Sequence, residues 1–203
     1  MSSHDLDQLL SSLQSTAAID DACRRGDGVL DRPHEVTTLL AVALMIATGL
    51  RVSEVAGIRC SDIDLAGRSL RTVGKGRRER QVYLTNEWIN ALTGAYLRTR
   101  VALGVGHSYL LFNRVHGPLS APAVRARLTK AAREAGLTTR VTPHMLRHTA
   151  ATQLIEAGVD IRYIQRLLGH ASLSTTEIYT HVADRALLRV MSDADVLGRL
   201  MRP

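Results

Sequence analysis

The sequence predicts an α+β fold that is mainly α-helical and carries one small antiparallel β-sheet or hairpin near residues 69–84. The run Pro33–Thr48 is nearly all apolar, too long for a strand and too short to cross a membrane, so it predicts a buried helix. Two β-prone runs, SLRTV and QVYL, flank a glycine-containing basic turn, which is the pattern of a hairpin. A chain of 203 residues, 45% of them hydrophobic, can bury one core, so we expect a single domain over residues 1–203.

The first third of the chain is expected to build a junction between two helices. Residues 1–32 begin with a helical pattern of leucines and then lose it toward a Gly-Asp-Gly stretch, which predicts a weakly held lead-in. Gly49 should end the buried helix in a left-handed conformation, and Ser53 should cap a short helix that ends near Gly57. Arg51 lies between these helices, where a guanidinium taken alone is more often a structural tie than a functional group.

The predicted hairpin carries a concentrated positive charge in its turn. Lys75 lies between two glycines, where the backbone can approach a partner closely and the amine can reach it. Arg77, Arg78 and Arg80 follow and are expected to contact phosphates of a partner. The alternative is an exposed basic hairpin without a partner.

Periodicity and capping residues predict the elements beyond the hairpin. Polar caps precede apolar residues at helical spacing, and a glycine-rich loop separates the first of these helices from a short apolar run. The last segment is an amphipathic tail that either packs on its own domain or docks on a neighbouring protomer. The expected elements are a helix at 85–97 opened by Thr85 or Asn86, a strand at 109–112, a helix at 120–135 with a positive face and a helical tail at 183–203.

Four polar side chains are concentrated in residues 142–181. Thr142 should cap a helix whose first turn carries His144 and Arg147 on one face, near backbone amides that favour an anion. His170 follows the expected end of a later helix, and Tyr179 lies on a third short helix. Groups of these types near helix ends suggest a site that handles phosphate.

The positive charge is confined to the middle of the chain. Residues 68–147 hold 15 Lys and Arg against three Asp and Glu, whereas residues 1–67 hold five against ten and residues 148–203 hold six of each. This distribution predicts a surface for a polyanion, with a solvated basic face as the alternative. Because only 3% of the residues are aromatic, single-strand binding by stacking is disfavoured and a duplex fits better.

Five motifs, separated along the chain, occur together in an order and at spacings that indicate a family relationship. Any one of them would be weak, but jointly they resemble the tyrosine recombinase (phage-integrase-like) family over about Asp5–Val182. The resemblance implies the catalytic-domain fold of that family. The motifs are ATGLRVSEV around Arg51, VGKGRRERQVYL around Lys75, TPHMLRHTAAT around His144 and Arg147, LLGHAS around His170, and STTEIYTHV around Tyr179.

The resemblance implies a role for each matching residue. Tyr179 would be the nucleophile that joins the 3′ phosphate of the cleaved strand and frees a 5′ hydroxyl. Lys75 would be the general acid for the 5′ oxygen, and His144 would accept the phenol proton. The remaining residues would hold the scissile phosphate or support those that hold it: Arg51, Arg147 and His170 for the phosphate and Glu54 for support.

The resemblance also implies the partners. The first partner is double-stranded DNA. On paired DNA sites the protein, monomeric when free, would assemble as a homotetramer, and accessory DNA-bending proteins would take part. The outcome would be integration, excision or inversion of a DNA element. We expect no cofactor and no metal, since the sequence has neither a P-loop nor a cluster of carboxylates. Cys23 and Cys60 are too few for a disulfide framework. No apolar segment is long enough to cross a membrane and no secretory signal is present, so we expect a cytoplasmic, nucleoid-associated protein and no membrane.

Two other functions compete with recombination. A type IB topoisomerase uses similar chemistry as a monomer, and a catalytically idle DNA-binding regulator could keep the fold. The complete set of motif residues favours an enzyme. Most members of the family that the sequence resembles carry a further N-terminal domain, but only about fifty residues precede Arg51. The resemblance therefore implies that the chain is the catalytic domain without the N-terminal core-binding domain, either naturally or by truncation.

Overall fold

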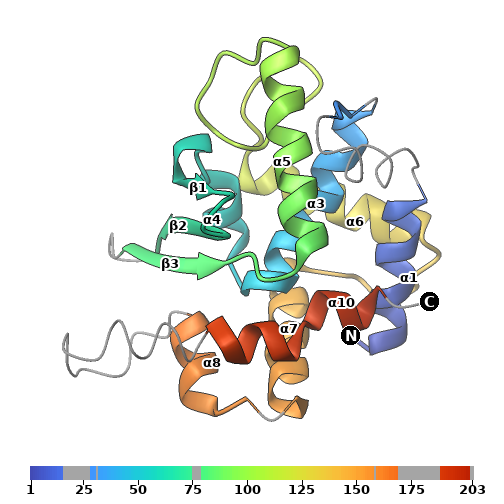
Figure 1. Cartoon of the computed structure of the whole chain (residues 1–203). Coiled ribbons are helices and arrows are strands. Elements are labelled where there is room, and N and C mark those ends of the chain that lie inside the picture. The colour runs from blue at the N-terminus through green and yellow to red at the C-terminus, as the bar shows by residue number, and fades with distance from the viewer. Residues whose placement is uncertain (16–27, 31, 75–78, 158, 169–187, 202–203) are drawn as a thin grey trace.

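The structure is a computed structural model of the whole chain, in which helices surround one central helix and a small sheet lies at one side (Figure 1). It combines helices with a three-stranded antiparallel sheet, so the predicted fold class is confirmed. None of the helices in the described ranges is long and apolar enough to cross a membrane. The structure describes residues 1–15, 28–30, 32–74, 79–157, 159–168 and 188–201.

Helix α3 (Pro33–Thr48) is the centre of the core, as the apolar run predicts. Twelve of its 16 residues are buried, and helices α1, α4, α5, α6, α7 and α10 all pack against it. A helix that is apolar on every side must be covered on every side, which explains this arrangement. Gly49 ends the helix with a φ of 66°, in the left-handed conformation that the sequence predicts.

Helix α1 (Ser3–Gln14) belongs to the core and is not loosely held. Ser2 and Asp5 form a capping box at its start, and Leu6 and Leu9 are fully buried. The helix packs on α3, α6 and α10. The predicted weak lead-in is therefore wrong for its first half, because the buried leucines anchor it. Residues 16–27 lie outside the described part of the chain.

The sheet contains the predicted hairpin and one further strand. Strands β2 (Ser69–Val73) and β3 (Glu79–Tyr83) pair antiparallel, with Thr72 opposite Arg80. Strand β1 (Ile63–Asp64) adds to the other edge of β2 after a short 3₁₀ turn. Two residues are too few to show an alternating pattern, so β1 could not be predicted.

The helices after the hairpin agree largely with their predicted positions. Asn86, Ser120 and Thr142 each accept a backbone hydrogen bond as N-caps. The predicted strand at 109–112 is wrong: these residues form only isolated bridges, and their apolar character reflects burial of the loop. The helices are α5 (Glu87–Ala102), α6 (Ala121–Glu134) and α7 (Pro143–Glu156).

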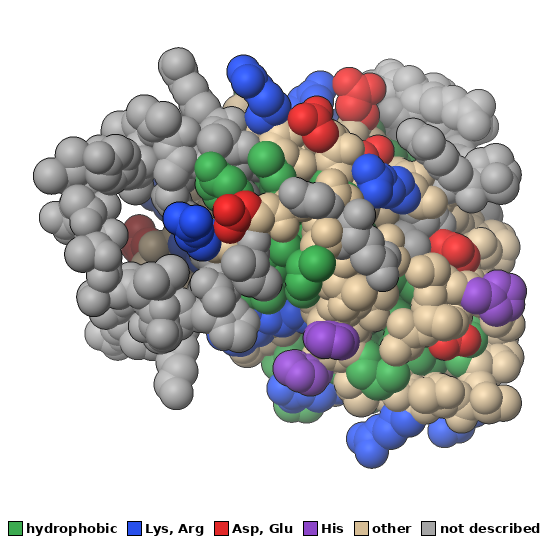
Figure 2. Space-filling view, turned by 90° about the horizontal axis from the view of Figure 1, so that it is seen from below, with side chains coloured by type: hydrophobic (Ala, Val, Ile, Leu, Met, Phe, Trp, Pro, Cys, Tyr) green, Lys and Arg blue, Asp and Glu red, His purple; other side chains and the backbone are tan. Residues whose placement is uncertain are grey.

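The C-terminal elements pack on the lower side of the molecule in Figure 1. Helix α8 (Ile161–Leu168) contacts α7. Residues 188–194 are helical and lead into α10 (Val196–Leu200), which packs on α1, α3 and α7 of its own domain. Seen from this side, the described surface mixes acidic and basic side chains (Figure 2), in line with the balanced charge of residues 148–203.

Candidate active site

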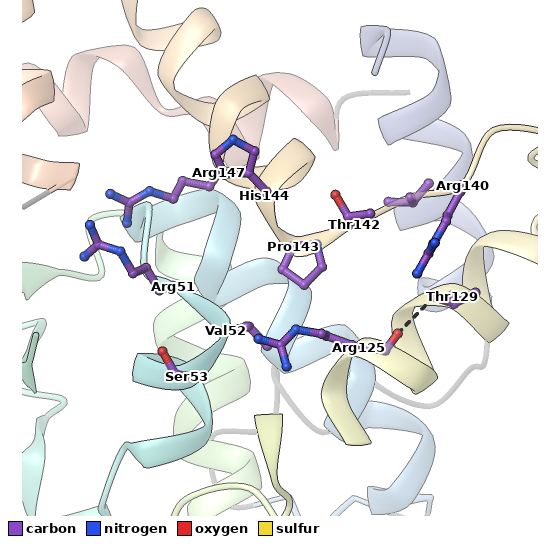
Figure 3. Close-up of a pocket in the computed structure, with 11 residues that line it drawn as sticks. Arg51, Val52, Ser53, Arg125, Thr129, Arg140, Thr142, Pro143, His144 and Arg147 are labelled. Carbon is purple, nitrogen blue, oxygen red and sulfur yellow. Dashed lines mark hydrogen bonds between the residues drawn. The ribbon is translucent and has the colours of Figure 1, made fainter. Parts of the chain in front are cut away.

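A pocket of about 500 Å³ opens between the start of α4 (Val52–Gly57), helix α6 and the first turns of α7 (Figure 3). Among the residues that the structure describes, its lining includes basic side chains from all of these elements and no carboxylate. Because the lining is cationic and holds no carboxylate, the pocket is electrostatically suited to an anion. The basic side chains of the lining are Arg51, Arg125, Arg140, His144 and Arg147.

Arg51 lies at the junction between α3 and α4 and serves as the N-cap of α4. The prediction that Ser53 caps this helix is therefore wrong. The carboxylate of Glu54 accepts the Arg51 backbone N–H at 2.7 Å, so a side chain from the third helical position closes the helix start. The Arg51 side chain is 38% exposed and faces the pocket, with one guanidinium nitrogen 3.2 Å from Glu54 Oε1.

Arg147 is held more tightly than Arg51. Its two terminal nitrogens donate to the backbone carbonyls of Gly49 and Leu168, which are at the C-terminal ends of α3 and α8. Helix C-termini carry partial negative charge, so they suit a buried cation. Burial lowers the pKa of Arg147 to about 10, with the nearby positive charge of Arg51 as the next cause, and the side chain remains cationic at neutral pH.

The guanidinium groups of Arg51 and Arg147 extend toward the same side of the pocket in Figure 3. The effect of the Arg51 charge on the pKa of Arg147 agrees with this proximity. His144 lies one turn before Arg147 on α7, is exposed, and lines the same pocket. Three of the predicted site residues, from segments about ninety residues apart, are therefore together.

Glu54 is buried directly behind Arg51, with its side chain 4% exposed. Burial alone would raise the pKa of this carboxyl, but hydrogen bonds from Arg80 and from the Arg51 backbone outweigh it, so the pKa lies below its ordinary value. Glu54 is thus a buried anion that is ionised at neutral pH and is stabilised by two arginines.

Arg80 is one of these two arginines. Its terminal nitrogens lie 2.8 and 2.9 Å from the two carboxylate oxygens of Glu54, and its side chain is 18% exposed. The sequence predicts Arg80 as a phosphate contact on an exposed hairpin. The structure places this guanidinium inward, on a carboxylate, so a role in DNA contact stays a prediction.

Other predicted site residues lie outside the described part of the chain. The described hairpin strands end on either side of the basic turn, and α8 ends at Leu168. Within the described residues, no group of three potential metal-binding side chains was found. The predicted residues that fall outside are Lys75, Arg77, Arg78, His170 and Tyr179.

Two arginines of the pocket were not singled out from the sequence. Arg125, on α6, reaches toward Val52, and Arg140, before α7, points toward Thr129 (Figure 3). Arg125 is recognisable only as part of a positive helix face. Arg140 lies in a segment without periodicity. Only its position two residues before the helix cap Thr142 could have indicated from the sequence that it lies near the site.

Comparisons of the sequence find one family over nearly the whole chain. A family model described as the phage integrase family matches residues 7–186. The tyrosine recombinase XerD of Mycobacterium tuberculosis is 38% identical over 197 residues, which cover 96% of this chain and 61% of XerD. The tyrosine recombinase XerC of Listeria welshimeri is 42% identical over 166 residues, which cover 78% of this chain and 55% of XerC. The chain thus spans 55 to 61% of the length of these relatives.

Solved structures show the same fold. The crystal structure of XerA recombinase is 28% identical, has a TM-score of 0.69 and is matched over 93% of this chain and 62% of that one. The XerH site-specific recombinase bound to a palindromic difH substrate is 25% identical with a TM-score of 0.66, and the match covers 95% of this chain and 52% of that one.

Proposed function

This chain belongs to the phage integrase family, and we propose that it cleaves and rejoins double-stranded DNA at specific sites as a tyrosine recombinase. The observation that carries the proposal is the pocket in which Arg51 and Arg147 converge beside His144. The naming of the relatives as recombinases favours this activity over DNA relaxation by a topoisomerase.

The pocket is suited to the transition state of phosphoryl transfer. A phosphodiester is already anionic and gains charge when a fifth oxygen approaches phosphorus, so preplaced cations lower the barrier most. The forked donors of two guanidiniums match the non-bridging oxygens better than ammonium groups would. Because the Arg147 side chain is fixed by two carbonyls and the Arg51 backbone by Glu54, little reorganisation is needed when the phosphate enters.

The covalent step is assigned by the motifs. The phenol oxygen of Tyr179 would attack phosphorus and form a 3′-phosphotyrosyl bond, while the bond to the 5′ oxygen breaks. A phenol titrates near pH 10, so it needs a proton acceptor, and His144 in the pocket wall suits this task. Lys75 would protonate the departing 5′ oxygen, and His170 would add a donor to the phosphate.

A different 5′ hydroxyl can then attack the phosphotyrosyl bond and rejoin the strand. The number of phosphodiester bonds is conserved, so the cycle needs no external energy source. Four protomers on two duplex sites would exchange strands in this way, with accessory DNA-bending proteins as further partners. The products would be integration, excision or inversion on cytoplasmic, nucleoid-bound DNA. The difH complex of XerH supports DNA as the partner.

Covalent capture tests the proposal. Nicked duplexes with randomised inverted repeats are incubated with the protein, and DNA that stays bound through denaturation is sequenced. We expect enrichment of one site, on which the wild-type chain forms an adduct and Tyr179→Phe forms none. Adduct formation by Tyr179→Phe would refute the assigned nucleophile, and absence of any adduct with the wild type would refute the activity.

A further inference from the structure

A buried carboxylate joins the hairpin to the helix junction. Glu54 accepts both terminal nitrogens of Arg80 and, from Arg51, the backbone N–H and one guanidinium nitrogen. With its side chain 4% exposed, Glu54 has little access to water, so these donors must compensate its charge. Arg80 leaves β3 on the inner face, two residues before the fully buried Val82, which brings it to α4.

The two arginines do not share Glu54 equally. Arg80 bonds both oxygens at 2.8 and 2.9 Å, in the fork-to-fork geometry of a strong pair. The Arg51 guanidinium makes one longer contact of 3.2 Å and no other hydrogen bond to a described residue. Arg51 is also twice as exposed, at 38% against 18%, and lines the pocket, whereas Arg80 does not.

This asymmetry matters for the chemistry at Arg51. Without Arg80, Glu54 would lose its bidentate donor and would have Arg51 as its remaining counterion. Arg51 would then be drawn into a bidentate pair with Glu54, and its donors would be lost to a phosphate. If Arg51 stayed on the phosphate instead, the unpaired charge of Glu54 would lie directly behind the phosphate site and repel it.

We propose that Arg80 is a positioning residue for strand cleavage, which neutralises Glu54 and thereby leaves the Arg51 guanidinium free to bind the scissile phosphate. The inference rests on the proposed function. It replaces the direct DNA contact that the sequence predicts for Arg80 with an action through Glu54 and Arg51.

A double-mutant cycle distinguishes the two roles. Arg80→Met removes the charge but keeps much of the side-chain volume, and Glu54→Gln removes the charge that Arg80 compensates. We expect Arg80→Met to slow single-turnover cleavage of the captured site at least about tenfold, and the double variant to recover most of this loss, because no buried charge remains. A double variant as slow as Arg80→Met, or slower, would overturn the proposal.

The salt dependence of DNA binding supplies a readout that a phosphate contact would change. Losing such a contact lowers the slope of log affinity against log salt by about one. In Arg80→Met the slope should fall, because Arg51 is drawn from the phosphate to Glu54, and Glu54→Gln in the same chain should restore the wild-type slope, because Arg80 itself does not line the phosphate pocket. A double variant whose slope stays reduced by about one would assign Arg80 to the DNA backbone and contradict the proposal.

Two further variants control for folding. Arg68→Met breaks an Arg–Glu pair of similar type, but Arg68 and its partner Glu87 are exposed and outside the pocket. Arg68→Met should leave the cleavage rate unchanged. Arg80→Lys keeps the positive charge, so its cleavage rate should lie between those of the wild type and Arg80→Met.

The melting temperature gives a test of the Arg80–Glu54 coupling that does not depend on catalysis. Arg80→Met should lower the melting temperature, and Glu54→Gln in the same chain should restore part of it, whether or not the protein cleaves DNA. If the wild type forms no adduct, the proposed function fails by that result alone. Strictly additive losses of melting temperature would show that Arg80 does not act through Glu54, which would overturn the inference.

Discussion

Arg147 combines two tasks that a lysine could not perform together. Its guanidinium donates to the carbonyls of Gly49 and Leu168 and still faces the pocket. Lysine presents all its donors on one nitrogen, so it lacks the separated nitrogens with which the guanidinium serves two carbonyls and still faces a phosphate. These contacts make Arg147 both a phosphate ligand in our proposal and a tie between two helix ends.

Arg147→Lys is therefore expected to impair both cleavage and stability. Cleavage of the captured site should fall by about 100-fold or more, because a bidentate donor to the transition state is lost. The unfolding free energy should fall by about 1–3 kcal/mol, because buried carbonyls lose their partners. Single-turnover kinetics and urea unfolding measure the two effects, and near-wild-type cleavage by this variant would exclude Arg147 from the phosphate site.

The lowered pKa of Glu54 predicts a dependence of stability on pH. The carboxylate is stabilised in the folded state, so its contribution is fully present above the ordinary pKa of 4.5 and is lost as the pH falls through the lower folded value. The difference in unfolding free energy between wild type and Glu54→Gln should accordingly be constant near neutrality and shrink below about pH 4.5. Urea unfolding from pH 3 to 7 tests this, and a difference that does not change with pH would contradict it.

Sequence motifs identify several residues of the site but not their pairing. Arg51, His144 and Arg147 are recognisable from their motifs, and the pocket brings them together. The Arg80 pair with Glu54 spans 26 positions and depends on strand register and on the way that α4 meets the sheet. The two-residue period of β3, which places Arg80 on the same face as Val82, was the only local signal for its inward direction.

At the scale of elements, the site depends on the way that the end of α3 meets the end of α8. Gly49 has a φ of 66°, and a Cβ atom there would lie 2.9 Å from a methyl carbon of Leu168. Glycine is thus favoured by the backbone conformation, and a methyl group there would also displace the Leu168 side chain. The carbonyls of these same two residues hold Arg147, so a displacement of either helix end would move the arginine.

Gly49→Ala should lower the unfolding free energy by about 1–3 kcal/mol, because alanine is strained at positive φ and crowds α8. Cleavage should slow more than DNA binding weakens, since Arg147 is displaced while the basic surface remains. Gly57→Ala is the matched control: no atom lies within 4 Å of the place that its methyl group would take and its φ is not positive, so it should be neutral. Equal effects of the two substitutions would exclude a special role for Gly49.

Elements with strong periodicity or clear caps could be predicted, and those defined by tertiary packing could not. The α3 limits and the Asn86, Ser120 and Thr142 caps follow from local chemistry. Residues 109–112 have the composition of a strand but lack a neighbouring strand to pair with over their length, so they form a buried loop with isolated bridges. Short apolar runs do not reveal whether a pairing partner exists.

At the scale of the molecule, the distribution of charge predicts function better than any single element. The basic middle of the chain supplies α6 and the start of α7, and four arginines from the described residues line one pocket. The face seen in Figure 2, on the side where α7, α8 and α10 lie in Figure 1, mixes acidic and basic side chains. Long-range packing was less predictable: the leucines of α1 and residues of α10 complete the core around α3.

The central claim is that this molecule joins DNA covalently through one tyrosine. The tryptic peptide over residues 167–185 contains Tyr179 as its single tyrosine, so mass spectrometry of the trypsin- and nuclease-treated adduct measures both the attachment site and the strand polarity. Our account predicts a nucleotide attached through its 3′ phosphate to Tyr179, with a free 5′ hydroxyl on the released strand. Attachment to another residue, or through a 5′ phosphate, would contradict it.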